Sequence, residues 1–340
     1  MLHGRRLSVF LFCAVVAVPL LGLELFGQDK DKDKKAKEGS KEGGKVTLEW
    51  KFKEKEPFYQ TMKTTTTQTM KVMNNDVTQK QEQTFYFSWK VLEQDKDGKW
   101  VLEQKILGVK MDIDIGGSPI KYDSTSAAAN NTSNPLSEFF KALVGSEFKV
   151  TVDPKTLKID KIEGREEFVK KLIDANKQMK PLLDQILSEK ALKEMAEPTF
   201  AVVTTEPVEK GKKWTKQTTL DMGPIGKYTN DYTYTYEGED KDLDTIKVET
   251  KLTYNPPDKT EGPGGLPFKI KSADLKSKSS SGTVWFNRKK GRVEKSEMNL
   301  DLTGKLTIEI GGQQTEVELS QTQKTTVKTM DHNPLEPAKP

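Results

Sequence analysis

The sequence predicts an α+β protein made mainly of long, twisted antiparallel β-strands, with a central helical segment packed on the sheet. Three observations favour this class. Apolar and polar residues alternate over long stretches in both halves of the chain, which is the pattern of half-buried strands. Turn sequences separate these stretches. Helical spacing of apolar residues dominates only near the middle. The sheet is either a half-barrel or sandwich-like, in one body or in two lobes.

Composition limits the possible functions. The 340 residues, 34% of them hydrophobic, are enough for one large or two modest domains. Charged residues make up 31% of the chain, and the formal net charge is only +4. So small and dispersed a charge argues against a nucleic-acid partner. With one cysteine and two histidines, we expect no disulfide, no metal site, no cofactor and no catalytic triad that needs histidine.

Residues 1–27 have the layout of a secretory signal peptide. Arg5 and Arg6 precede the uncharged apolar run Leu7–Leu23, and Gly27 supplies a small residue for cleavage. The run is slightly longer than a usual signal, so an uncleaved membrane anchor is the alternative. We expect export to the periplasm or the extracellular space, with membrane contact only through this segment, transiently or as an anchor.

Five segments follow the signal peptide. Residues 28–45 form a charged leader without large apolar side chains, which predicts disorder. An N-terminal β-rich lobe is expected over 46–162, a helical segment over 163–198 and a C-terminal β-rich lobe over 199–330. Residues 331–340, with three prolines, form a tail that we expect to be frayed.

The N-terminal lobe begins with the alternating stretch Val46–Phe52, which predicts a half-buried strand. Threonine-rich Phe58–Met73 predicts the next strand, because β-branched residues favour strands. A turn at Asn74–Asp76 leads to a strand over Gln83–Leu92. On the return strand the apolar face changes parity at Leu107–Gly108, which predicts a β-bulge.

Prolines and glycines delimit the expected helices. Pro135 opens a short helix that stops at Gly145. The central segment is either two helices or one helix kinked at Pro181, and it ends before Pro198. Antiparallel hairpins then resume, one of them turning at Gly291.

Two patterns that imitate chemical sites have simpler interpretations. Asp112 and Asp114 share a strand face, and paired carboxylates can serve sugar hydrolysis. Their alternation with apolar residues instead favours a solvated face. Glu93–Gly98 imitates part of a calcium loop, but Gln104 stands where a carboxylate would be needed. We therefore expect no catalytic, cofactor-binding or metal-binding residue.

Two aromatic stripes are the candidates for a ligand groove. The simpler interpretation is ordinary sheet core. The functional one is the lining of a groove for an apolar ligand between a curved sheet and the helices. Tyrosine suits such a lining because it combines an apolar ring with a polar tip. The candidate residues are Phe85, Phe87 and Trp89 in the N-terminal lobe and Tyr232, Tyr234 and Tyr236 in the C-terminal lobe.

Four stretches resemble an uncharacterised family of exported bacterial β-rich proteins. They are Tyr59–Met73, Val144–Phe148 with its following hairpin, Pro207–Trp214 and Gly282–Val293. The resemblance extends over most of residues 46–330. It implies no established activity and no catalytic residue. One departure is the pair Lys212 and Lys213 before Trp214, where the family pattern has an acidic or small polar residue.

The sequence therefore predicts an exported, non-enzymatic protein of the cell envelope. The sharpest version of this hypothesis is that a lipid or another apolar small molecule binds between a curved sheet and helices. The alternative is a structural or protein-interaction module that contacts other envelope proteins. A hydrolase that uses carboxylates alone is the least favoured possibility.

Overall fold

The computed structural model describes residues 44–54, 56–72, 75–126, 135–258 and 266–336. The expected signal peptide (1–27), all but the last two residues of the expected leader, and the end of the expected tail lie outside the described residues. The predictions for those segments therefore stay predictions.

The described strands form one antiparallel sheet of twelve strands. They are β1 (Phe58–Val72), β2 (Asn75–Gln94), β3 (Trp100–Ile115), β4 (Ser118–Asp123), β5 (Glu147–Val152), β6 (Ile159–Glu163), β7 (Lys213–Asp221), β8 (Lys227–Asp240), β9 (Leu243–Asn255), β10 (Lys269–Asn287), β11 (Arg292–Ile310) and β12 (Gln313–Met330). The helices are α2 (Pro135–Leu143), α3 (Arg165–Ala175), α4 (Lys180–Ile186) and α5 (Glu189–Ala201), with 3₁₀ turns η2 (Lys177–Met179) and η3 (Gly223–Ile225).

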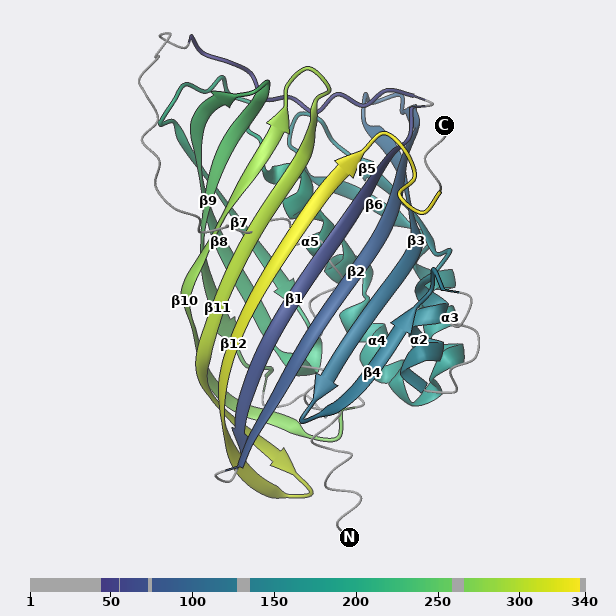
Figure 1. Ribbon diagram of the computed structural model, residues 1–340, viewed down its shortest axis with the longest axis vertical. Helices are drawn as coiled ribbons and strands as arrows, with labels where there is room; N and C mark the ends of the chain where they lie inside the picture. The colour runs from purple at the N-terminus through teal and green to yellow at the C-terminus, as the bar shows by residue number, and fades with distance from the viewer. Residues whose placement is uncertain (1–43, 55, 73–74, 127–134, 259–265, 337–340) are drawn as a thin grey trace.

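The first and last long strands meet at the centre of the sheet. The strand order is β6-β5-β3-β2-β1-β12-β11-β10-β9-β8-β7, and β4 pairs with β3. β1 pairs with β12 without a register shift from Tyr59↔Met330 to Val72↔Val317, and the two strands lie side by side in Figure 1. The antiparallel, strand-dominated class is confirmed, as one open sheet. The division into two lobes stays a prediction.

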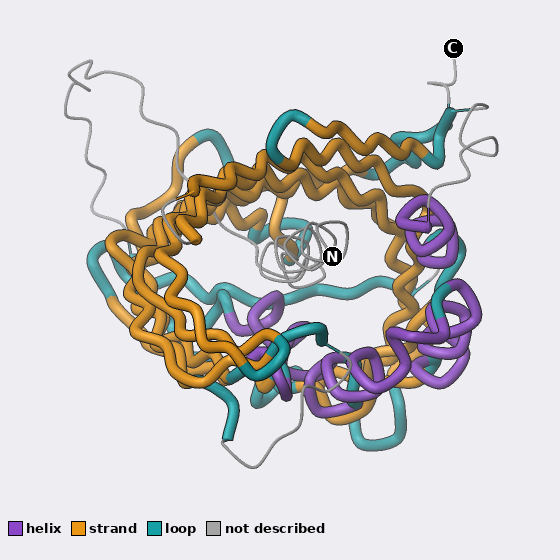
Figure 2. The backbone as a smooth tube through the Cα atoms, turned by 90° about the horizontal axis from the view of Figure 1, so that it is seen from below, coloured by secondary structure: helices purple, strands orange, loops and turns teal. Residues whose placement is uncertain are grey.

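The sheet is strongly curved. Viewed from below, its strands form an arc with helices along one side (Figure 2). Helices α3, α4 and α5 connect β6 to β7, the two terminal strands of the sheet, and α5 lies against both of them. The concave face therefore carries the core. None of the helices described here is long and apolar enough to cross a membrane.

The predicted bulge in β3 is confirmed. The pairing between β2 and β3 shifts so that Phe87 faces Ile106 while Tyr86 faces Gly108, which leaves Leu107 as the extra residue. Ile106 and Val109 are both buried although their numbers differ in parity. A bulge of this kind increases the local twist and keeps both apolar stretches of the strand on the concave face.

The predicted strand at Val46–Phe52 is wrong. We call residues 46–52 the strap, because they cross one end of the curved sheet (purple, top of Figure 1). Val46 and Val208 exchange backbone hydrogen bonds of 2.8 and 2.7 Å, and the Lys51 N–H donates to the carbonyl of Gly291 at 2.9 Å. These partners belong to different parts of the chain, so no continuous ladder forms. Alternate burial alone does not distinguish a strand from such a segment.

The central helical segment contains three α-helices rather than two or one. Pro181 stands in the first turn of α4, where its missing N–H is tolerated. The Ser188 hydroxyl accepts a hydrogen bond of 3.2 Å from the Ala191 N–H and begins α5. Helix α5 continues through Pro198 to Ala201, four residues beyond the predicted end at Glu197.

Candidate functional site

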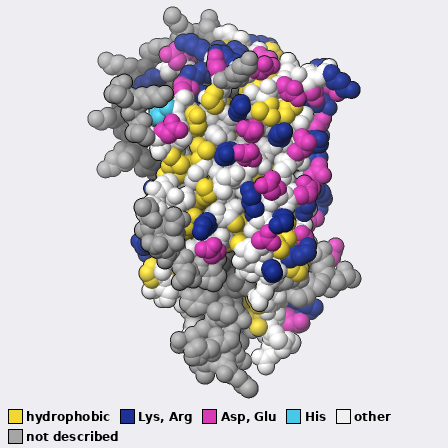
Figure 3. Space-filling view, turned by 90° about the vertical axis from the view of Figure 1, so that its right-hand side faces the viewer, with side chains coloured by type: hydrophobic (Ala, Val, Ile, Leu, Met, Phe, Trp, Pro, Cys, Tyr) yellow, Lys and Arg dark blue, Asp and Glu magenta, His cyan; other side chains and the backbone are white. Residues whose placement is uncertain are grey.

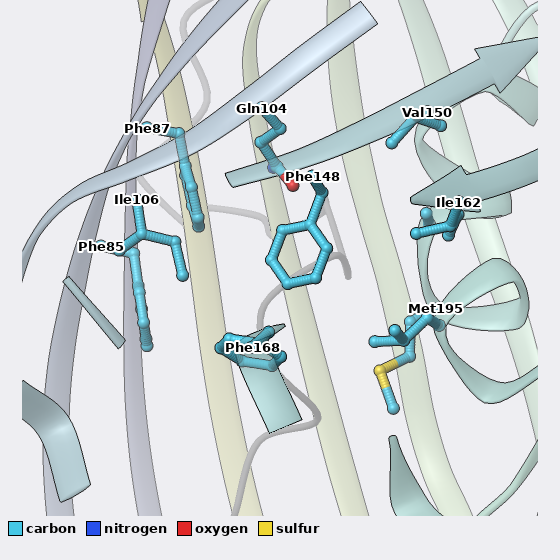
Figure 4. Close-up of a pocket in the computed structure, with 11 residues that line it drawn as sticks. Phe85, Phe87, Gln104, Ile106, Phe148, Val150, Ile162, Phe168 and Met195 are labelled. Atoms are coloured by element: carbon cyan, nitrogen blue, oxygen red, sulfur yellow. The ribbon is translucent and has the colours of Figure 1, made fainter. Parts of the chain in front are cut away.

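An apolar pocket lies on the concave face between four adjacent strands and two helices (Figure 4). Its cavity volume is about 60 Å³, and the whole hollow, counted out to its open side, is about 620 Å³. It is lined by Phe85 and Phe87 of β2, Gln104 and Ile106 of β3, Phe148 and Val150 of β5, Ile162 of β6, Phe168 of α3, and Leu192, Met195 and Ala196 of α5. Gln104 is the single polar side chain in this lining.

The strand side of the pocket follows from the alternation in β2. Phe85 and Phe87 point to the same face, and their rings stack with centroids 5.8 Å apart and planes 6° apart. Ile106 is the register partner of Phe87 and lies beside the two rings in Figure 4. The bulge that follows Ile106 is therefore what keeps this residue in the pocket.

The side formed by β5 and α3 depends on a tight turn at Gly164. The rings of Phe148 and Phe168 meet edge to face, 4.9 Å apart at 73°. Gly164 has φ +95°, and a Cβ atom there would lie 2.4 Å from the carbonyl oxygen of Glu147. Only glycine fits this close approach without strain. Helix α3 can thus begin directly after β6 and place Phe168 over Phe148.

Helix α5 closes the pocket on the side opposite β2. Leu192, Met195 and Ala196 are three and four residues apart, so they share one face of the helix. Met195 and Ile162 face Phe85 and Phe87 across the hollow in Figure 4. Methionine is unbranched and flexible, which makes this the adaptable side of the pocket.

The N-terminal aromatic stripe is divided between two environments. Phe85 and Phe87 line the pocket, whereas Trp89 does not. The Trp89 ring stacks on Phe58 at 6.0 Å and 8° and meets the edge of Phe200 at 6.3 Å. Its indole N–H donates to Gln60 Oε1 at 2.8 Å. Trp89 thus belongs to an aromatic cluster under the strap.

The C-terminal stripe lies in the other half of the concave face and does not line this pocket. Tyr232 stacks on Tyr234 at 5.9 Å, and Tyr234 stacks on Trp214 at 5.5 Å. The Tyr236 hydroxyl donates to Asp244 Oδ1 at 2.7 Å. Burial raises the pKa of the Tyr234 hydroxyl well above its ordinary value, so this group stays neutral. The structure does not bring the two stripes together in one site.

Sequence reasoning missed most of the pocket lining. Phe148, Phe168 and Met195 come from three different elements and stand 63 to 110 residues after Phe85 in the chain. Their signals were present: Phe148 stands in an alternating stretch, and the other two stand on apolar helix faces. What the sequence lacked was the information that these three elements fold over β2.

The two carboxylates considered for catalysis lie outside the pocket, on the exposed face of β3. Asp112 pairs with Lys121 at 2.7 Å, and Asp114 Oδ1 accepts the Gly117 N–H at 2.7 Å. Acidic and basic side chains are interspersed in the same way on the face shown in Figure 3. Within the described ranges, no three His, Cys, Asp or Glu side chains converge to hold a metal ion.

Comparisons with known proteins give distant similarities. No curated protein matches the chain. Among solved structures, a lipovitellin chain described by "lipid-protein interactions in lipovitellin" is similar at 10% identity and a TM-score of 0.43, over 85% of this chain and 26% of that one. OccK5 (OpdH) of Pseudomonas aeruginosa has 5% identity and a TM-score of 0.23, over 84% of this chain and 100% of that one. The chain spans about a quarter of the lipovitellin chain, and TM-scores this low assign no function.

The family comparison is more specific than the structural ones. A family model matches residues 97–293, which run from the start of β3 into β11 and include most of the pocket. This range is more than half of the 340 residues. The resemblance to an uncharacterised family is thereby confirmed, and the protein belongs to the family of unknown function DUF6263.

Proposed function

We propose that this protein binds an apolar small molecule, or the apolar part of a lipid, in the pocket between β2, β3, β5, β6 and helices α3 and α5. The observation that carries the proposal is a partly open hollow lined by ten apolar side chains and one amide. Ligand sites are typically concave and mostly apolar, with few polar groups. A hollow of this composition favours ligands that bind through burial of apolar surface.

The size of the cavity bears on how a ligand enters. Drug-sized ligands occupy pockets of about 300–1,000 Å³, whereas the cavity volume here is about 60 Å³ within the larger hollow. An acyl chain must therefore move side chains as it binds. Met195 and Leu192 are the ones we expect to move, because they stand on a single helix face and have flexible side chains.

The proposed role is non-enzymatic and follows export from the cytoplasm. Export is inferred from the charged and apolar N-terminal sequence, Arg5–Leu23. A non-catalytic role is inferred because Asp112 and Asp114 are engaged on the outer face, away from the pocket. A structural or protein-interaction module of the envelope is the alternative that the following experiment distinguishes.

Filling the pocket should weaken the binding of a neutral apolar dye. We expect N-phenyl-1-naphthylamine to bind the native protein saturably, with fluorescence enhancement. Ala196→Leu should weaken this binding by at least about 10-fold, because the new side chain occupies the space between α5 and the Phe85 ring. Fluorescence titration at constant protein concentration measures the effect.

Ala191→Leu is the matched control. Ala191 is buried on the same helix but does not line the pocket, so this variant should suffer a similar overpacking penalty while the dye still binds. Equal binding by both variants and the native chain would place the dye elsewhere. No binding by any of them would favour the interaction-module alternative.

A further inference from the structure

The concave face carries a patch of neutral polar side chains that the apolar pocket does not include. The patch is formed by three short stretches in which every second side chain points to this face. The stretches are Gln79–Gln83 in β2, Thr64–Gln68 in β1 and Gln321–Thr325 in β12. The register aligns them in three rows across three strands, with Gln68 between Gln79 and Gln321. All nine are glutamine or threonine. We call this group the polar patch.

Apolar residues surround the polar patch on all four sides. Phe85 follows it along β2, and Met70 follows it in the opposite direction along β1. Inward residues of Met111–Ile115 in β3 flank it on one side, and those of Met298–Leu302 in β11 flank it on the other. From strand spacing, the patch measures about 10 Å across the strands and about 14 Å along them. The end of the patch next to Phe85 adjoins the apolar pocket, because Phe85 also lines that pocket.

Several polar atoms of the patch lack hydrogen-bond partners although they are buried. Gln68 is 0% exposed, and neither its amide nitrogen nor its amide oxygen has a partner; the Thr66 hydroxyl also lacks one. Gln79 donates to Gln81 at 3.1 Å and Gln81 donates to Gln83 at 3.2 Å. This ladder leaves Gln79 Oε1 and Gln83 Nε2 free at its two ends. Unpaired buried polar atoms are destabilising, so their presence here points to a ligand.

Charge is excluded from this face of the three strands. The inward-facing residues of β1, β2 up to Val91, and β12 include no Lys, Arg, Asp or Glu. The outward face carries charged pairs, for example Lys63 with Glu82 at 2.8 Å. A charged head group would find no counter-ion at the patch and would have to be desolvated, which is costly. Hydroxyl and amide groups would find both donors and acceptors.

We infer that the ligand is an amphiphile with an uncharged, hydroxyl-rich head group, as in a glycolipid. The head group binds the polar patch and the apolar chain enters the adjoining pocket past Phe85. This inference rests on the proposed function and adds the chemical class of the ligand. The head group satisfies the free atoms of Gln68, Thr66 and the two ends of the glutamine ladder.

A first test is the stability of the ligand-free protein. The double variant Thr66→Val, Gln68→Met removes groups that make no hydrogen bond, so its melting temperature should equal or exceed that of the native chain. The matched control Gln60→Met lies on the same face of β1. It removes an amide that accepts from Trp89 at 2.8 Å and donates to Thr329 at 3.3 Å. The melting temperature of this control should be at least about 2 °C below that of the native chain.

A second test compares two ligands with the same 12-carbon chain, dodecyl maltoside and dodecanoate, each below its micelle-forming concentration. Dye displacement should show that the native protein binds the maltoside at least about 10-fold more tightly, which corresponds to about 1.4 kcal/mol. The variant Thr66→Val, Gln68→Met should weaken maltoside binding by about 10-fold and leave dodecanoate binding unchanged.

Three results would overturn the inference. Equal affinity of the native protein for both compounds would show that the head group is not recognised, while the proposed apolar pocket would stand. A double variant that melts as low as Gln60→Met would make the polar patch a structural element. Failure of both compounds to displace the dye would remove the proposed function as well.

Discussion

Replacing Phe200 by alanine should lower the free energy of unfolding by about 3–5 kcal/mol. Phe200 is 2% exposed, and its ring meets those of Trp50, Phe52 and Trp89 at 5.6, 6.3 and 6.3 Å. It thus joins α5, the strap and β2, while its carbonyl accepts the Trp50 indole N–H at 3.0 Å. Truncation leaves a cavity where three segments meet. Urea denaturation followed by far-ultraviolet circular dichroism measures the loss.

Phe139→Ala is the control for removal of a phenyl ring. Phe139 is only half-buried on α2, and within the described residues its one ring contact is with Phe140 at 5.9 Å. Phe139→Ala should lower the free energy of unfolding by much less than Phe200→Ala does. Equal losses from the two substitutions would contradict the view that the cluster under the strap holds this end of the sheet together.

Replacing Arg288 by methionine should lower the free energy of unfolding by a similar amount, about 3–5 kcal/mol. Asp244 is 1% exposed, and Arg288 holds it by two hydrogen bonds of 2.8 Å, one to each carboxylate oxygen. The hydrogen bond with Asp244 raises the pKa of the Arg288 guanidinium. Without the guanidinium, the Tyr236 hydroxyl would be the one side-chain donor left to this buried carboxylate among the residues that the structure describes. Denaturant unfolding is again the measurement.

The neighbouring residue supplies a matched control. Lys289 pairs with Asp242 at 2.6 Å, but both side chains are more than two-thirds exposed. Solvent screens exposed pairs of this kind, and they contribute little to stability, so Lys289→Met should be nearly neutral. If Arg288→Met lowers the free energy of unfolding no more than Lys289→Met does, the buried ion pair between Arg288 and Asp244 does not stabilise the fold as stated.

The strand pattern of the fold was predictable because it depends on local sequence. Threonine content located β1, two-residue alternation located the second half of β2, and the change of parity at Leu107–Gly108 located the bulge. Local patterns failed where tertiary contacts decide. The strap has the alternation of a strand, but its hydrogen bonds go to Val208 and to Gly291. Nothing within residues 46–52 specifies those partners.

The candidate site was predictable only in part, for the same reason. Phe85 and Phe87 were identified from their stripe, but the stripe alone could not separate them from Trp89, whose environment depends on Phe200 of α5. The tyrosine stripe is equally regular, yet it lies in the other half of the face. Which aromatic residues share a pocket depends on sheet curvature, and no short stretch of sequence encodes that.

The polar patch shows a second limit of pattern reading. A threonine- and glutamine-rich stretch such as Thr64–Gln68 predicts a strand, but polarity would place the glutamines in solvent. The structure buries them, with Gln68 facing Gln79 and Gln321 across the neighbouring strands. Only the register between β1, β2 and β12 reveals that three short polar stretches form one surface.

The most direct test of the central claim is mass spectrometry of an organic extract from the full chain, expressed with its own N-terminus and purified without detergent. We predict an apolar compound at about one molecule per chain, carrying an uncharged polar head group. We also predict that the compound is missing from extracts of Ala196→Leu and present in extracts of Ala191→Leu. A clean extract from the native protein, together with no dye binding, would contradict the claim that this family member is a carrier of apolar ligands.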